Sequence, residues 1–339
     1  MEPLDAQVLS QSLQWQAQRQ RVLLVSVART WGSSPRPPGS LMALREDGLT
    51  VGSVSGGCVE DDLVHRLRQG DIGLDAATDR PRLVRYGVTT EQAHRFGLPC
   101  GGTLELMLEP LSAHSRLAET LAALEQRQSL QRTLDLRSGA VTLAPGAHDA
   151  VPHWADEHHF VSQLGPQARL LLIGAGDLSR YLAGMARGMG FDVTVCDPRP
   201  EQAQWAEPGI GFSREMPDDL VQRLRPDRRT AVVAVSHDPK LDDLALIDAL
   251  QTEAFYIGAI GSRRNSATRR QRLREHFGLS EAQLDRLRGP AGLPIGSKTP
   301  AEIALSILAE VVATKNGVAA AAVLSSAPSQ PSTDAVTHP

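Results

Sequence analysis

The sequence lacks the features that would assign it to several special classes of protein. Its 339 residues include only three cysteines, Cys58, Cys100 and Cys196, which are odd in number and far apart. This spacing excludes a disulfide framework and a Cys-x-x-Cys zinc site. No apolar run approaches the length that spans a bilayer, and the acidic N-terminus has no signal-peptide segment. A net charge of −4 argues against a general nucleic-acid or anionic-membrane binder. We therefore expect a globular protein of the reducing cytoplasm, without nucleic-acid or membrane partners.

A glycine turn between an apolar strand and a helix is the strongest local pattern. The apolar run 169–173 ends at Gly174, turns through Gly176 and continues with helical spacing, and a second apolar run ends at Asp197. This order is typical of the phosphate site of a dinucleotide-binding fold. Gly174 permits the tight turn, Gly176 lets a phosphate approach the backbone, and the helix start supplies free N–H groups. A Rossmann-like domain with an empty or altered pocket is the alternative.

Strands and helices alternate from Arg169 onward, which predicts a parallel sheet. Ligands of such a sheet bind beyond the carboxyl ends of its strands. The residues that we expect to bind a ligand there are Gly174, Gly176, Asp197, His237, Asp238, Ser262, Arg263 and Lys298. The cations would meet phosphate, and Asp197 would accept hydrogen bonds from a ribose-like or pterin-like edge. Two alternatives stay open: a solvated basic helix start for Arg263 and its neighbour, and a histidine bonded to local backbone for His237.

Two glycine loops in the N-terminal half each carry a cysteine. Gly56 and Gly57 precede Cys58 before a predicted helix, and Cys100 precedes Gly101 before a predicted strand. Glycine leaves backbone N–H groups exposed, and a helix start favours the thiolate form of a cysteine. These residues would suit a nucleophile, a metal ligand or a sulfur-handling group. Two small buried residues in tight turns are the alternative.

The fold class that these patterns predict is α/β, with an N-terminal α+β domain and a C-terminal Rossmann-like domain. The expected segments are an N-terminal domain over 1–145, a linker over 146–165, a Rossmann-like domain over 166–323 and a disordered tail over 324–339. The linker carries His153, His158 and His159, but no cysteine or carboxylate constellation frames them, so a solvated segment is a better interpretation than a metal site.

Several motifs occur together in one order along the chain. They are Gly56-Gly57-Cys58-Val59-Glu60, Pro99-Cys100-Gly101-Gly102, Gly174-Ala175-Gly176, Ser236-His237-Asp238 with Asp242, Tyr256–Arg263 and Lys298–Glu302. The combination resembles the XdhC/CoxI family of xanthine dehydrogenase accessory factors. The resemblance covers nearly the whole folded chain, from Val22 to Val312. Asp177 departs from the histidine common in the family, and it places a carboxylate beside any anion at the turn.

The resemblance implies a chaperone of the molybdenum cofactor rather than an enzyme. Such a protein binds Mo-molybdopterin as cargo, protects it, supports its sulfuration by a cysteine desulfurase and inserts it into xanthine dehydrogenase or a related molybdenum hydroxylase. Cys58 and Cys100 would then hold molybdenum or sulfur, and both halves would face one cleft. The alternatives are an NAD(P)-dependent oxidoreductase, a nucleotide-dependent molybdopterin transferase and a non-catalytic scaffold. A homodimer is also expected from the apolar final helix.

Overall fold

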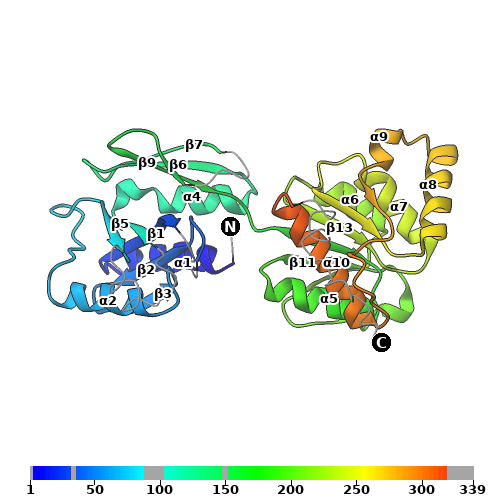
Figure 1. Ribbon diagram of the computed structural model, residues 1–339, viewed down its shortest axis with the longest axis horizontal. Coiled ribbons are helices and arrows are strands. Elements are labelled where there is room, and N and C mark those ends of the chain that lie inside the picture. Colours follow the sequence, from blue (N-terminus) through cyan, green and yellow to red (C-terminus); the bar gives the residue numbers. More distant parts are fainter. Residues whose placement is uncertain (1–2, 32–35, 88–102, 147–151, 319–339) are drawn as a thin grey trace, which may run out of the picture. The chain divides into compact units, whose positions relative to one another are not determined.

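The computed structural model describes residues 3–31, 36–87, 103–146 and 152–318. The chain folds into two compact units, residues 1–167 and 168–339 (Figure 1). Each unit has its own hydrophobic cores and is described here by itself. Within the described ranges, none of the helices combines the length and the apolar character needed to cross a membrane.

The described residues of the N-terminal unit form two antiparallel sheets with helices packed against them. Its elements are α1 (Pro3–Ala17), β1 (Val22–Trp31), β2 (Leu41–Arg45), β3 (Thr50–Gly52), α2 (Cys58–Arg68), β4 (Arg82–Tyr86), β5 (Thr103–Pro110), α4 (Leu117–Glu125), β6 (Leu130–Asp135), β7 (Val141–Pro145), β8 (His153–Trp154) and β9 (His159–Leu164). The strand orders are β3-β2-β1-β5-β4 and β7-β6-β9-β8. Val59 and Leu63 of α2 pack on one face of the five-stranded sheet, because their spacing of four residues places them on one side of the helix.

The predicted linker is wrong over residues 153–164. These residues form β8 and β9, and β9 pairs with β6 along its whole length. Phe160 and Val161 are buried, and Asp156 closes the turn by accepting hydrogen bonds from the backbone N–H groups of His158 and His159. The polar composition reflects this exposed turn, while the short apolar strand behind it completes the smaller sheet.

The C-terminal unit is a single parallel sheet covered by helices. Its elements are β10 (Arg169–Ile173), α5 (Asp177–Gly188), β11 (Asp192–Cys196), β12 (Gly211–Ser213), α6 (Pro217–Leu224), β13 (Thr230–Ala234), α7 (Pro239–Ala249), β14 (Tyr256–Ala259), α8 (Arg263–Phe277), α9 (Glu281–Leu284), β15 (Leu287–Arg288) and α10 (Pro300–Lys315). The strand order β12-β11-β10-β13-β14-β15 is that of a Rossmann fold, which confirms the predicted fold class.

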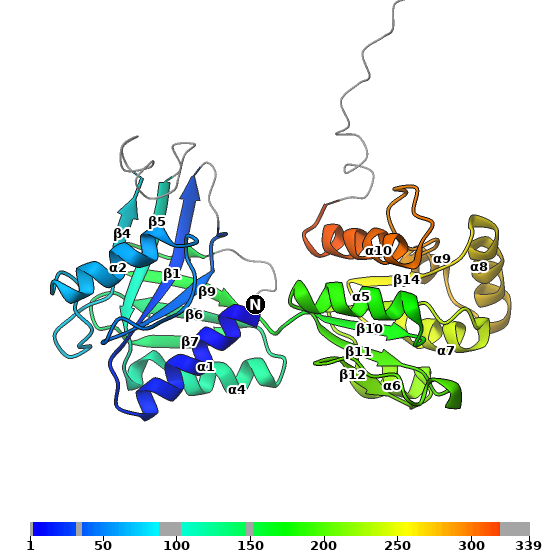
Figure 2. The same cartoon turned by 90° about the horizontal axis from the view of Figure 1, so that it is seen from below.

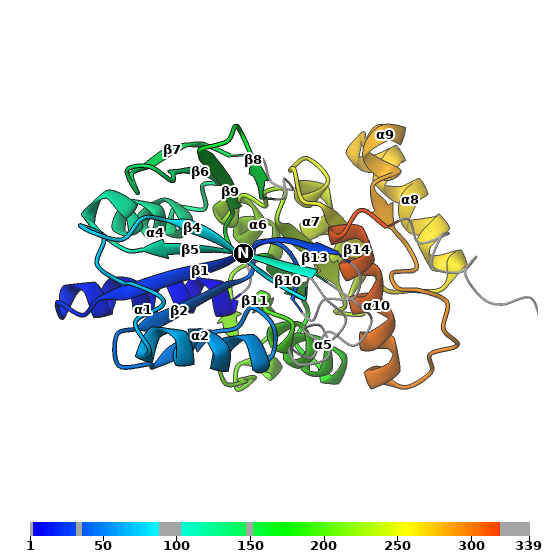
Figure 3. The ribbon, with the colours of Figure 1, turned by 60° about the vertical axis from the view of Figure 1, so that its left-hand side comes forward.

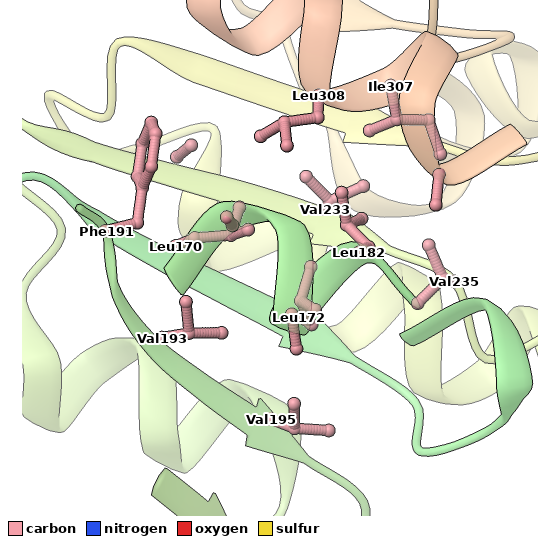
Figure 4. Packing of buried hydrophobic residues seen from close by; sticks show 14 of the residues in the cluster. Leu170, Leu172, Leu182, Phe191, Val193, Val195, Val233, Val235, Ile307 and Leu308 are labelled. Carbon is pink, nitrogen blue, oxygen red and sulfur yellow. The ribbon is translucent and has the colours of Figure 1, made fainter. Parts of the chain in front are cut away.

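Helices cover both faces of this sheet, α5 and α10 on one side and α6 and α7 on the other (Figure 2). Figure 4 shows Leu182 of α5 and Leu308 of α10 packing toward Leu172 and Val233 of the central strands. The helix α10 begins where its capping box predicts. Thr299 Oγ1 accepts a hydrogen bond from the N–H of Glu302, and the side chain of Glu302 accepts one from the N–H of Thr299.

Candidate functional site

A crevice opens in the C-terminal unit at the carboxyl ends of β13 and β14. Its volume is about 650 Å³, which is in the range of small-molecule sites. The strand order reverses beside it, between β10 and β13, and this is where ligands bind in open α/β sheets. Apolar side chains such as Leu178 of α5, Ile260 after β14 and Ile303 of α10 form much of its wall. The polar lining comes from His237, Asp242, Asn265, Thr268, Arg269, Arg272, Ser297 and Ser306. Figure 3 shows α8 in yellow to orange and α10 in orange.

The polar floor of the crevice is a closed network of charges. Asp242 Oδ1 accepts from Ser236 Oγ at 2.7 Å, and Asp242 Oδ2 accepts from Arg269 Nη2 at 2.9 Å. The same guanidinium reaches Asp243 at 3.1 Å, and Arg272 Nε donates to Asp243 at 2.6 Å. Burial raises the pKa of Asp242, although Ser236 and Arg269 act in the opposite direction. Two carboxylates and two guanidinium groups therefore balance one another below the ligand space.

The rim of the crevice carries a different charge. Arg263 and Arg264 lie between the lining residues Gly261 and Asn265, and Lys298 follows Ser297, although none of the three is itself among the residues that line the crevice. These three cations are exposed, and in the part of the chain that the structure describes no carboxylate forms a salt bridge with their side chains. Both α8 and α10 begin here, so the positive ends of two helix dipoles accompany the cations.

The predicted residues that follow β13 and β14 take separate roles. His237 is exposed, lines the crevice and has a φ of 61°, so it is held in the left-handed region. Asp238 is the N-cap of α7, and its Oδ1 accepts from the N–H of Lys240 at 2.9 Å. Ser262 is likewise the N-cap of α8, because its Oγ accepts from the N–H of Asn265 at 3.1 Å. Neither capping residue is among those that line the crevice.

The glycine turn at Gly174 has the expected shape, but one of its N–H groups donates to a side chain of the protein and is not free for a ligand. Gly174 has a φ of 108°, and a Cβ there would lie 2.4 Å from Cα of Ser236. A Cβ on Gly176 would meet nothing within 4 Å. The N–H of Ala175, one of the donors expected to face a phosphate, donates to Asp197 Oδ2 at 2.8 Å. Gly174 is therefore required by the loop after the neighbouring strand, whereas no close contact from the described residues requires a glycine at position 176.

The contacts of Asp197 do not support its predicted role as an acceptor of hydrogen bonds from a ligand. The residue is fully buried, and both carboxylate oxygens accept from the side chain of Arg199, Oδ1 at 2.9 Å and Oδ2 at 2.6 Å. Burial alone would raise the pKa of Asp197, but the hydrogen bonds from Arg199 and Ala175 outweigh it and lower the pKa. A carboxylate bonded in this way braces the turn and has no free lone pair directed at a ligand.

The loop before α2 is also filled by a carboxylate of the protein. Glu60 Oε1 accepts from the N–H groups of Val54 and Ser55, each at 2.8 Å, and Glu60 Oε2 accepts from the N–H of Gly57 at 2.9 Å. The N–H of Gly56 reaches Oε1 at 3.1 Å. The prediction that Gly56 and Gly57 offer free donors to a ligand is therefore wrong, because Glu60 takes those donors.

Cys58 is the first residue of α2, which is the position predicted for it at a helix start, and its side chain is exposed. Cys100 and Gly101 lie outside the described residues. No group of three or more histidine, cysteine, aspartate or glutamate side chains within the described ranges is arranged to hold a metal ion. Cys196 is buried at the end of β11, and desolvation together with Asp197 raises its pKa to about 12, so it is a thiol at neutral pH.

Sequence reasoning missed the polar side of the crevice. Asn265, Arg269 and Arg272 follow one another at intervals of four and three residues, so they occupy one face of α8. That spacing was available as a signal, but the sequence does not show which of the many arginines of α8 turn inward. A buried pair outside the crevice lining was also missed: the hydroxyl of Tyr256 donates to Glu310 at 2.7 Å and secures α10 to β14.

Comparisons with known proteins agree with this architecture. Two family models match the chain, one described as the XdhC Rossmann domain over residues 170–311 and one as the XdhC and CoxI family over residues 15–87. An Escherichia coli protein named "Molybdenum cofactor insertion chaperone PaoD" is 29% identical, with 86% of this chain and 83% of that protein covered. A Bacillus subtilis protein, named as a probable subunit of xanthine dehydrogenase, is 25% identical, with 89% and 95% covered. A crystal structure from Bacillus halodurans, described as a xanthine dehydrogenase, is 26% identical with a TM-score of 0.71, and 96% of this chain and 98% of that chain are covered.

Proposed function

Because the chain belongs to the XdhC and CoxI family, we propose that it binds the molybdenum cofactor as cargo and inserts it into a molybdenum hydroxylase of the xanthine dehydrogenase type. The name of the Escherichia coli relative, a molybdenum cofactor insertion chaperone, supports this proposal, and the name of the Bacillus subtilis relative supports the class of client enzyme. A cysteine desulfurase that sulfurates the cofactor and a homodimeric state stay predictions from the sequence.

The observation that carries the proposal is the chemistry of the crevice in the C-terminal unit. Molybdopterin consists of a flat polar pterin, a phosphate and a dithiolene that holds molybdenum. Leu178, Ile260 and Ile303 provide apolar walls for a flat ring, and Asn265 and Ser297 provide hydrogen-bonding groups at its edge. The cationic rim suits a phosphate. A pterin phosphate therefore fits this crevice in size, polarity and charge.

The soft end of the cofactor calls for a soft ligand, and Cys58 is the candidate among the described residues. A thiolate is a soft ligand of the kind that binds molybdenum or carries sulfur. Cys58 is exposed at a helix start, which suits either task. Cys100 keeps the same proposed role from the sequence.

Anaerobic purification from a host that makes the cofactor tests the proposal. We expect the chain to co-purify with molybdenum and a fluorescent oxidised pterin, and to activate a cofactor-free xanthine dehydrogenase. Cys58→Ser with Cys100→Ser should reduce the molybdenum content and the activation, whereas the matched control Cys196→Ser should not, because that thiol is buried. A chain that carries neither molybdenum nor pterin and activates no client would refute the proposal.

A further inference from the structure

We infer that the C-terminal unit holds the anionic end of its ligand at the neighbouring starts of α8 and α10, and that its glycine turn, residues 174–176, takes no phosphate. The inference rests on the proposed function and deepens it. It assigns a phosphate site that differs from the one used by dinucleotide-binding proteins with the same strand order. It also names the ligand class, a compact heterocycle with a phosphate monoester rather than a dinucleotide.

The first argument is that the glycine turn is already occupied. In a dinucleotide site, the N–H groups of the turn face a pyrophosphate, and the acid that ends the second strand binds a ribose. Here that acid, Asp197, takes the N–H of Ala175 at 2.8 Å and is covered by Arg199. The acid and the turn bind each other, so neither presents its usual group to a nucleotide.

The second argument concerns charge at the start of α5. Asp177 is the first residue of this helix and is exposed, and the carboxylate of Asp197 lies behind the turn. A phosphate at this helix start would approach the carboxylate of Asp177, which repels it, whereas the charge of Asp197 is balanced by its salt bridge to Arg199. The dipole of one helix does not offset the unit charge of Asp177, since it corresponds to only about half a charge.

The third argument is that the other end of the crevice has the opposite character. The starts of α8 and α10 both contribute to the lining, through Gly261 and Asn265 and through Ser297 and Pro300. Three cations accompany them, Arg263, Arg264 and Lys298, and none forms a salt bridge within the described part of the chain. Glu302 already accepts hydrogen bonds from the N–H groups of Lys298 and Thr299, so the start of α10 offers an anion the side chain of Lys298 rather than these N–H groups. The start of α8 with Arg263, Arg264 and Lys298 near one crevice favours an anion.

A buried hydroxyl group without a hydrogen-bond partner among the described residues lies at the start of α8. Ser266, in the first turn of α8, is 6% exposed, and among the described residues its Oγ has no hydrogen-bond partner. It lies directly behind Gly261 and Gly289, at 3.9 Å and 3.1 Å from the positions that a Cβ would take there. Buried hydroxyl groups are nearly always hydrogen-bonded, so this one indicates a ligand atom or a bound water at the start of α8.

Fluorescence titration of the full chain tests the inference, with the oxidised fluorescent pterin from molybdopterin as probe, in its phosphorylated and dephosphorylated forms. We expect the phosphorylated form to bind about tenfold or more tightly, as one charge-assisted hydrogen bond would give. Arg263→Ala with Lys298→Ala should abolish this preference. Arg214→Ala with Arg228→Ala removes two exposed cations elsewhere in the unit and should leave it unchanged.

The variant Gly176→Ala distinguishes a phosphate bound at the glycine turn from one bound at the starts of α8 and α10. A Cβ at this residue meets nothing in the protein, so the variant should fold and bind both probes as the parent chain does. In a dinucleotide-type site the same methyl group would meet the phosphate. Loss of the phosphate preference in Gly176→Ala, its survival in the rim variant, or saturable binding of NADH would each overturn the inference. If the parent chain binds neither probe, the proposed function fails together with it.

Discussion

Replacing Glu60 by glutamine should destabilise the N-terminal unit by about 2–3 kcal/mol at neutral pH. The carboxylate accepts from four backbone N–H groups and from the hydroxyls of Ser53 and Ser55. Burial alone would raise its pKa, but these donors lower the pKa from 4.5 to about 2. At about 1.4 kcal/mol per pKa unit, that difference corresponds to about 3 kcal/mol of stability, which partial exposure reduces. Glutamine keeps one acceptor oxygen and turns an NH₂ group toward donors.

The pH dependence follows from the direction of the shift. Because the folded protein lowers the pKa of Glu60, the stabilisation is complete above 4.5, the ordinary value, and disappears as the pH falls toward about 2. The parent chain and Glu60→Gln should therefore differ most at pH 7 and little at pH 2.5. Urea denaturation followed by circular dichroism, carried out at pH 7 and at pH 2.5, measures this difference in stability.

Asp61→Asn is the matched control for this experiment. Asp61 is the next acidic residue in the first turn of α2 and is exposed, and within the described ranges its carboxylate accepts no hydrogen bond from the loop. Its replacement should change stability by no more than about 0.5 kcal/mol. The reasoning fails if Glu60→Gln costs less than about 1 kcal/mol at pH 7, or if its cost is the same at pH 7 and pH 2.5.

Three further substitutions test the C-terminal unit, each by urea denaturation followed by circular dichroism. Gly174→Ala should prevent stable folding of the unit, because its Cβ would lie 2.4 Å from the backbone of Ser236; a variant with parental stability would contradict the assigned turn. Arg269→Leu should cost about 3–5 kcal/mol, since it leaves two buried carboxylates of α7 without their shared partner, and a cost near zero would contradict the network. Tyr256→Phe should cost about 1–2 kcal/mol through the hydrogen bond lost to Glu310, with an unchanged stability as the contrary result.

Local rules explain why parts of the fold could be predicted from the sequence. The helix 300–315 has a proline at its first position and a capping box at Thr299, and both signals act within one turn. The turn at Gly174 follows from an apolar strand that ends in a glycine. The strands β8 and β9 could not be predicted in this way, since β9 is held by β6, 24 to 34 residues earlier in the chain, and β8 is held in turn by β9.

The candidate site was predictable only where its residues follow the strand ends. Topology places His237 and Gly261 beside each other once the sheet is parallel, and both line the crevice. The partners of individual side chains were not predictable. Asp197 pairs with the N–H of Ala175, 22 residues away, and the sequence pattern of an acid after a glycine turn is the same whether that acid faces a ribose or the turn.

The loop before α2 shows how a glycine motif can serve the protein rather than a ligand. Gly56 and Gly57 have φ values of 98° and 143°, which a residue with a side chain rarely adopts. These values bend the loop around the carboxylate of Glu60, only three residues beyond Gly57, so little chain entropy is lost in closing it. Glycines, serines and Glu60 thus form one unit that fixes the start of α2. What the motif leaves exposed is the side chain of Cys58, so we expect its chemistry to depend on Glu60 through the rigidity of the loop rather than through direct contact.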